Sequence, residues 1–168
     1  MNTNIFRSSY ALAATFGLVV LVAQPATAQT TGTMTATADV TANCQVNSNG
    51  IAFGATDVID GAEHMITGAV NVMCTTGTAW TASANAGLGT DATITTRKMQ
   101  SGTNSLDYSL FTDAGGTTVW GDGTTGSTIG GTGTGQFVAT AITGVIPANQ
   151  TTVPAGTYTD TVTVTVNY

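Results

Sequence analysis

Few residues of this chain are suited to acid–base or nucleophilic chemistry. His64 is the only histidine among the 168 residues, and it ends the polar run at 60–64. A serine–histidine–carboxylate triad would have to use this histidine, and no nucleophile-elbow motif accompanies it. The nine acidic residues are scattered over expected turns and strand ends, so no spacing predicts a catalytic pair. We interpret His64 as an ordinary surface residue and predict that the protein is not an enzyme.

A glycine- and threonine-rich run at 121–135 invites two binding-site interpretations. It lacks the Gly-Lys-Ser/Thr ending and the following helix of a phosphate-binding loop. Asp122 is its only acidic residue, and a calcium-binding repeat would need a periodic set. We therefore predict a mobile loop here, and the sequence indicates no cofactor and no metal ion.

Two cysteines, Cys44 and Cys74, are the only ones in the chain. In an exported protein, an isolated pair indicates a disulfide. A metal site is the alternative, but only His64 could assist it. A disulfide closing a loop of this length stabilises a fold by roughly 3–4 kcal/mol in the chain-entropy model.

Residues 1–28 have the features of a cleaved signal peptide. Arg7 supplies a positive charge, residues 11–23 form an apolar core too short for a comfortable membrane span, and residues 26–28 match the small-x-small cleavage pattern. We expect cleavage after Ala28, and an uncleaved membrane anchor is the alternative. The mature chain would start at Gln29, and its net charge would change from −6 to −7 because Arg7 is lost.

The composition indicates an exported all-β protein. Charged residues make up 7% of the chain, and there are 21 glycines. Abundant threonine and valine favour strands, and glycine favours turns. The negative charge argues against nucleic acid and anionic membranes as partners, and we expect no membrane insertion after signal cleavage.

The two ends of the mature chain carry its most regular strand patterns. At 156–168, apolar and threonine residues alternate, which predicts a strand with one apolar face. Because the sequence stops inside this strand, we expect something to lie beside it. At 29–46 the alternation is unusually long, so we predict either one long strand or two functional strands laid end to end.

The middle of the chain adds further strands at turn-bounded intervals. Alternation predicts strands at 66–74, 79–86 and 106–112, and an apolar run predicts another at 136–146. Arg97 and Lys98, the only mature cations, are expected to mark a solvated strand end or edge. About seven strands indicate a β-sandwich of immunoglobulin type. Four aromatic residues could line a sugar site, but we favour core positions for them: Trp80, Tyr108, Trp120 and Tyr158.

Several motifs together resemble the spore coat protein U domain, which is shared by subunits of archaic chaperone–usher pili. IAFG at 51–54 lies between the two cysteines, and YSLFTD at 108–113 is followed by VWGDG at 119–123. The ending, from IPANQ to the final tyrosine, spans 146–168. The resemblance covers most of the mature chain, and the ending and the YSLFTD–VWGDG pair are its most specific parts.

The resemblance implies an immunoglobulin-like sandwich that lacks its last strand and is completed by donor-strand addition. A periplasmic chaperone would fill the open groove first. At an outer-membrane usher, the N-terminal extension of the next subunit, either another copy or another pilin, would replace it. The product would be a surface fimbria that serves adhesion and biofilm formation.

The resemblance also divides the chain into a signal peptide at 1–28, a donor-strand extension at 29–40 and a pilin domain at 41–168. The donor residues would be Met34, Ala36, Ala38 and Val40. The groove edge and chaperone contact would be Val162, Val164, Val166 and Tyr168, with the Tyr168 carboxylate bound by basic chaperone residues.

Three alternatives remain open. A spore or cyst coat protein would be expressed with development. A self-complete secreted binding domain, for example one for glycans, would keep its stability when residues 29–40 are removed. A small hydrolase would depend on His64.

Overall fold

A computed structural model describes residues 25–168 of the chain. The predicted signal peptide therefore lies outside the described residues except for 25–28. The chain divides into two units, Met1–Ala38 and Asp39–Tyr168. In the first unit, residues 25–38 form no strand and are exposed. The part of the chain that the structure describes contains no helix long and apolar enough to cross a membrane.

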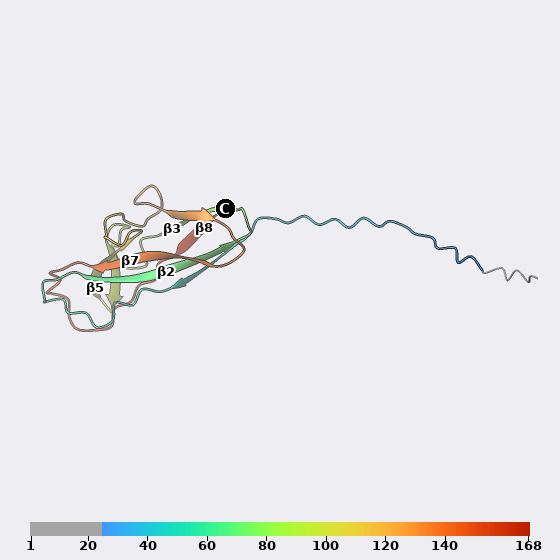
Figure 1. Cartoon of the computed structure of the whole chain (residues 1–168). Coiled ribbons are helices and arrows are strands. Elements are labelled where there is room, and N and C mark those ends of the chain that lie inside the picture. The colour runs from blue at the N-terminus through green and yellow to red at the C-terminus, as the bar shows by residue number, and fades with distance from the viewer. Residues whose placement is uncertain (1–24) are drawn as a thin grey trace, which may run out of the picture. The chain divides into compact units, whose positions relative to one another are not determined.

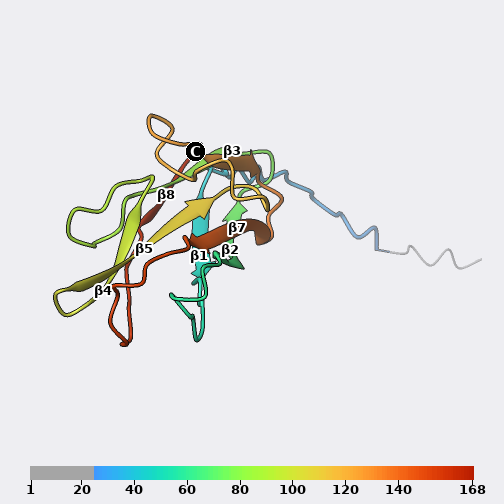
Figure 2. The same ribbon diagram turned by 90° about the vertical axis from the view of Figure 1, so that its left-hand side faces the viewer.

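The second unit consists of eight strands in two antiparallel sheets (Figures 1 and 2). One sheet has the order β1-β2-β7-β5-β4, and the other has the order β6-β3-β8. The predicted all-β, immunoglobulin-like sandwich is confirmed, with one strand more than the sequence indicated. The strands are β1 (Cys44–Asn49), β2 (His64–Cys74), β3 (Ala79–Ala84), β4 (Arg97–Ser101), β5 (Asn104–Phe111), β6 (Ile129–Thr132), β7 (Val138–Ile146) and β8 (Val164–Asn167).

The core follows the alternation of the sequence, because successive side chains of a strand point to opposite faces of the sheet. Every second residue is buried between the sheets in β3, in β2 from Val70 onward and in β5 from Leu106 onward. Three of the four aromatic residues assigned to the core, Trp80, Tyr108 and Trp120, are also buried there. The alternating buried residues are Val70, Val72, Cys74, Trp80, Ala82, Ala84, Leu106, Tyr108 and Leu110.

The predicted disulfide between Cys44 and Cys74 is present. The two residues are also direct partners in the antiparallel ladder of β1 and β2. Beyond the disulfide, the Thr75 amide donates a hydrogen bond to the Asn43 carbonyl (2.9 Å). The first strand is thus fixed to the second covalently and by backbone pairing.

The prediction that both mature cations are solvated is wrong for Arg97. Its side chain is completely buried, because the guanidinium finds backbone carbonyls inside the fold. Arg97 donates hydrogen bonds to the carbonyls of Asn85 (2.9 Å), Ile94 (2.9 Å) and Trp120 (2.8 Å). The expected edge position of this strand is correct, since β4 ends the five-stranded sheet. Lys98 lies at the partly exposed surface and pairs with Asp107 at 2.7 Å.

Two further expectations about strands need correction. Within 29–46, only the portion from Cys44 onward is a strand, because only that portion pairs with β2. The run at 121–135 is not simply a loop, since it contains β6. Burial of Ile129 and pairing with β3 explain why this glycine-rich segment forms a strand.

The last strand is also shorter than its sequence pattern, because it changes partners along its length. Thr159 pairs with Gln100 of β4 in an isolated bridge, whereas Val164 onward pairs with β3. Exposure nevertheless alternates from Tyr158 to Val166 as the sequence predicts.

Candidate functional site

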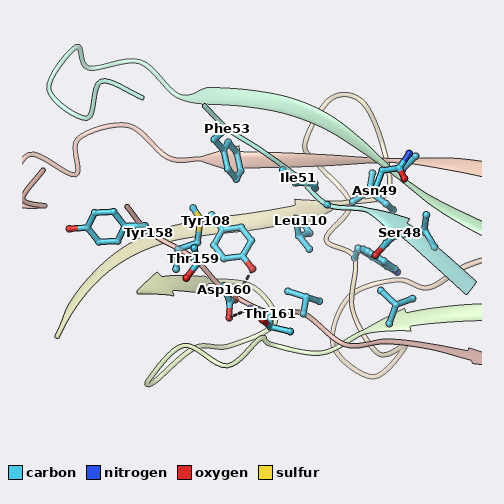
Figure 3. Close-up of a pocket in the computed structure, with 18 residues that line it drawn as sticks. Ser48, Asn49, Ile51, Phe53, Tyr108, Leu110, Tyr158, Thr159, Asp160 and Thr161 are labelled. Carbon is cyan, nitrogen blue, oxygen red and sulfur yellow. Dashed lines mark hydrogen bonds between the residues drawn. The ribbon is translucent and has the colours of Figure 1, made fainter. Parts of the chain in front are cut away.

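A groove of about 370 Å³ lies between the end of β1 and the segment that leads into β8 (Figure 3). β1 and β8 are each the outermost strand of their sheet, so the free edges of both sheets border the groove. The groove floor consists of core residues, among them Val70, Leu110 and Ile142. An opening into the hydrophobic core therefore exists at the place where the two sheet edges face each other.

A second hollow, of about 770 Å³, continues the groove toward the loops at 51–59 and 153–158. The two hollows share Ile51, Phe53, Met99 and Tyr158. Leu106, Ile146 and Val153 add to the apolar lining of the second hollow. Because they share these residues, the two hollows adjoin, and we call them together the acceptor groove.

Backbone pairing shows which groups of the last strand border the acceptor groove. Thr159 exchanges hydrogen bonds with Gln100, and the Thr163 carbonyl accepts from the Asn85 amide (3.1 Å). In an extended strand, alternate residues direct their backbone groups to opposite edges. The N–H and C=O groups of Asp160, Val162 and Val164 therefore point to the groove side. Such an edge is a template for another strand.

Aromatic side chains shape the middle of the groove. The Phe53 and Tyr108 rings meet edge to face, with centroids 6.3 Å apart and an interplanar angle of 73°. Tyr158 is half-buried, and its hydroxyl donates to the Pro154 carbonyl (2.8 Å). Tyr158 is thus a groove residue, and its hydroxyl is engaged by the chain itself.

The carboxylate of Asp160 lies in the first hollow, beside its apolar floor. The Tyr108 hydroxyl donates to Asp160 Oδ2 at 2.7 Å, and the Leu88 amide donates to Oδ1 at 2.8 Å. Figure 3 shows the Tyr108 and Asp160 side chains pointing toward one another. Burial, followed by the hydrogen bond to Asp160, raises the pKa of Tyr108 well above its usual value. Burial lowers the pKa of nearby Arg97. Electrostatic interactions with Tyr108 and Asp160 act in the opposite direction and partly offset this lowering.

The residues assigned to the groove edge from the sequence fall in different places. Val162 and Val164 line the groove. Val166 is half-buried on the same face and packs against the core. Tyr168 is 60% exposed, and its hydroxyl donates to Asn43 Oδ1 at 3.3 Å.

The residues assigned to the donor strand lie in the exposed N-terminal part of the chain. Met34 is 93% exposed and Val40 is 86% exposed. Ala36 and Ala38 are exposed as well. Their role as donors stays a prediction.

Sequence analysis missed much of the opposite wall and the centre of the groove. Ile51 and Phe53 lie within the IAFG motif. The motif contributed to the family resemblance, and Phe53 was expected to be a core residue, but neither residue was predicted to line a groove. Met99 follows the two cations and had no pattern of its own. Asp160 did leave a signal, because it breaks the apolar parity of the last strand.

His64 contacts the turn that precedes β2. Its Nε2 lies 2.7 Å from the Asp57 carbonyl and 3.3 Å from Asp60 Oδ2, so it ties together the turn before β2. Within residues 25–168, no group of three or more histidine, cysteine or acidic side chains is arranged to hold a metal ion.

Comparison with known proteins identifies the family. The model of the Spore Coat Protein U domain matches residues 30–165, and the chain belongs to this family. No curated protein matches the sequence.

A solved structure shares the fold. It is the crystal structure of the CsuC–CsuE chaperone–tip adhesion subunit pre-assembly complex from archaic chaperone–usher Csu pili of Acinetobacter baumannii. The match to one of its chains has a TM-score of 0.55 and 24% identity, and it covers 77% of this chain. This chain spans 40% of the length of that chain.

Proposed function

We propose that this chain is a structural subunit of a chaperone–usher pilus that polymerises by donor-strand exchange. The observation that carries the proposal is the acceptor groove, which opens into the core between two unpartnered sheet edges. Membership of the Spore Coat Protein U family supports it. The shared fold with a chain from a pilus pre-assembly complex is compatible with it.

The chemistry of the groove suits a β-strand as its ligand. Val70, Leu110 and Ile142 offer an apolar floor, and burying apolar surface yields about 25 cal/mol per Å². The backbone groups of Asp160, Val162 and Val164 need partners, and a strand supplies N–H and C=O groups at the matching spacing. Strand addition to a sheet edge satisfies both requirements at once.

The donor in this proposal is the segment 29–40 of another copy. Its residues alternate between small apolar and polar types, so one face can enter the groove while the other faces solvent. Met34, Ala36, Ala38 and Val40 are the inserting side chains. An extended segment of about 12 residues reaches roughly 40 Å, long enough to follow a groove built from two adjoining hollows.

The proposal also assigns partners and location. The chain is exported through its signal peptide, and a periplasmic chaperone occupies the acceptor groove until assembly. An outer-membrane usher then exchanges the chaperone for the next subunit. The Tyr168 carboxylate is a contact for basic chaperone residues. The product is a surface fimbria for adhesion and biofilm formation.

Peptide complementation tests the groove directly. The mature chain would carry Ala36→Asp and Ala38→Asp, which disable its own extension, and would be refolded with or without a synthetic peptide of residues 29–42. We expect the peptide to raise the melting temperature in a concentration-dependent way. A peptide carrying the same two aspartates is the matched control and should have no effect. Equal melting with both peptides would contradict the proposal.

A further inference from the structure

The last strand passes from one sheet to the other at the acceptor groove. Thr159 pairs with Gln100 of β4, in the five-stranded sheet. Five residues later, Val164 pairs with Ala84 of β3, in the three-stranded sheet. The intervening residues, 160–163, belong to neither ladder, yet they form one wall of the groove. Other contacts must hold their backbone in place.

Asp160 supplies the first of these contacts. Its carboxylate accepts hydrogen bonds from the Tyr108 hydroxyl (2.7 Å), the Leu88 amide (2.8 Å) and the Thr161 amide (2.7 Å). Tyr108 is 5% exposed and belongs to β5 of the five-stranded sheet. The Asp160 side chain therefore ties the crossing segment to a rigid core strand and to the turn after β3.

Asn85 supplies the second contact at the other end of the crossing segment. Its amide donates to the Thr163 carbonyl (3.1 Å), and its Oδ1 accepts from the Thr163 amide (2.9 Å). The Asn85 carbonyl in turn accepts from buried Arg97 (2.9 Å). Arg97 and Tyr108 are direct partners in the β4–β5 ladder. Tyr108 binds Asp160 and Arg97 binds Asn85, so the contacts at both ends of the crossing segment depend on this pair of buried residues.

We infer that Asp160 is a positioning residue for donor-strand capture, because with Tyr108 and the 85–88 turn it fixes the free backbone edge of residues 160–164. The inference rests on the proposed function. It adds that the Asp160 carboxylate holds one edge of the groove in the position that strand pairing needs. Strand pairing requires N···O distances of about 2.7–3.2 Å at several successive residues. An edge that is already in position avoids the entropy cost of ordering it on binding.

The arrangement also explains a carboxylate beside the apolar floor of the groove. A valine at position 160 would continue the apolar parity of the strand and would pack well. It would leave the Tyr108 hydroxyl and the Leu88 amide without this partner, and the loss is costly for the partly buried tyrosine hydroxyl. The carboxylate is therefore placed for its contacts within the chain, and the donor strand passes over it.

The test uses the mature chain with Ala36→Asp and Ala38→Asp and the synthetic peptide of residues 29–42. Asp160→Asn weakens the hydrogen-bond acceptor at position 160, and Tyr108→Phe removes only the hydroxyl that donates to it. Asp113→Asn is the matched control, because the Asp113 carboxylate also accepts backbone hydrogen bonds, from Thr117 and Thr118, but does not line the acceptor groove. Peptide affinity and amide hydrogen exchange would be measured for each.

We expect peptide binding at least tenfold weaker in Asp160→Asn and in Tyr108→Phe, and unchanged in Asp113→Asn. Amide exchange should accelerate in 159–164 while β2 and β7 keep their protection, a pattern that general destabilisation would not produce. Parent-like affinity in Tyr108→Phe and in a folded Asp160→Asn would overturn the inference. Failure of the parent chain to bind the peptide would instead overturn the proposed function.

Discussion

Cys44 and Cys74 are joined by a disulfide and are also direct partners in the β1–β2 ladder. The covalent bond and the backbone pairing therefore hold the same two strands at the same point. This point anchors β1, whose other edge borders the acceptor groove. On this side, the groove wall depends on β1, and β1 is paired along one edge only, with β2, to which its disulfide also joins it.

The disulfide predicts a large stability loss on its removal. The cysteines are 30 residues apart, and a loop of this size corresponds to roughly 3–4 kcal/mol in the chain-entropy model. Replacing both cysteines by alanine should lower the free energy of unfolding by about that amount, measured by urea denaturation of the peptide-complemented chain. A change below about 1 kcal/mol would show that β1 is held by its other contacts.

Arg97 and Lys98 are neighbours in sequence but should respond very differently to substitution. Arg97→Met leaves three carbonyls, one buried and two partly buried, without their donor, and we expect a loss of about 3 kcal/mol or more. Arg97→Lys should not rescue it, because one ammonium group cannot replace the guanidinium fork. Lys98→Met removes a partly exposed ion pair and should cost less than about 1 kcal/mol. Equal losses at the two positions in denaturation experiments would contradict this account.

Tyr108 predicts a loss of stability at high pH. Its pKa is raised in the folded chain, chiefly by burial, so the folded state holds this proton more tightly than the unfolded state. The contribution is complete below about pH 10, the ordinary pKa of tyrosine, and declines above it by at most about 1.4 kcal/mol per pH unit. Urea denaturation between pH 9 and 11 should show the decline.

Tyr108→Phe is the control for the pH experiment. This variant should be less stable at neutral pH but should show a shallower decline above pH 10. An identical slope in both chains would assign the pH dependence to other groups.

Val162 and Thr163 provide an adjacent pair that tests which face of the last strand receives the donor. Val162 lines the acceptor groove, whereas the Thr163 side chain is exposed. Val162→Asp places a charge in an apolar groove, and we expect peptide affinity to fall at least 100-fold, since burying an unpaired charge costs several kcal/mol. Thr163→Asp should change it little. The reverse order, measured by peptide titration, would place the donor on the other face.

The sequence predicted best where side-chain alternation alone decides the structure. Val70, Val72, Leu106 and Leu110 are buried because strand geometry sends alternate side chains inward. Arg97 was misassigned because its burial depends on the Asn85 and Trp120 carbonyls from other segments of the chain, which no local pattern reveals.

Some groove residues could be predicted from the local sequence pattern, whereas others depend on contacts between segments that are distant in the sequence. Val162 and Val164 followed from the parity of the last strand. Phe53 and Met99 lie in segments whose sequence did not indicate a groove, and they reach it only through the tertiary arrangement of the chain. Asp160 broke the parity, but the fold was needed to identify Tyr108 as its partner.

Electrophoresis without boiling tests the central claim most directly. The mature chain would be co-expressed with its candidate chaperone and usher, beside a matched chain that lacks residues 29–40. Donor-strand exchange predicts a ladder of oligomers from the intact chain that collapses on boiling and is missing from the truncated chain. A single monomer band from both chains, each with a cooperative melt, would contradict the account and would favour a self-complete secreted β-sandwich.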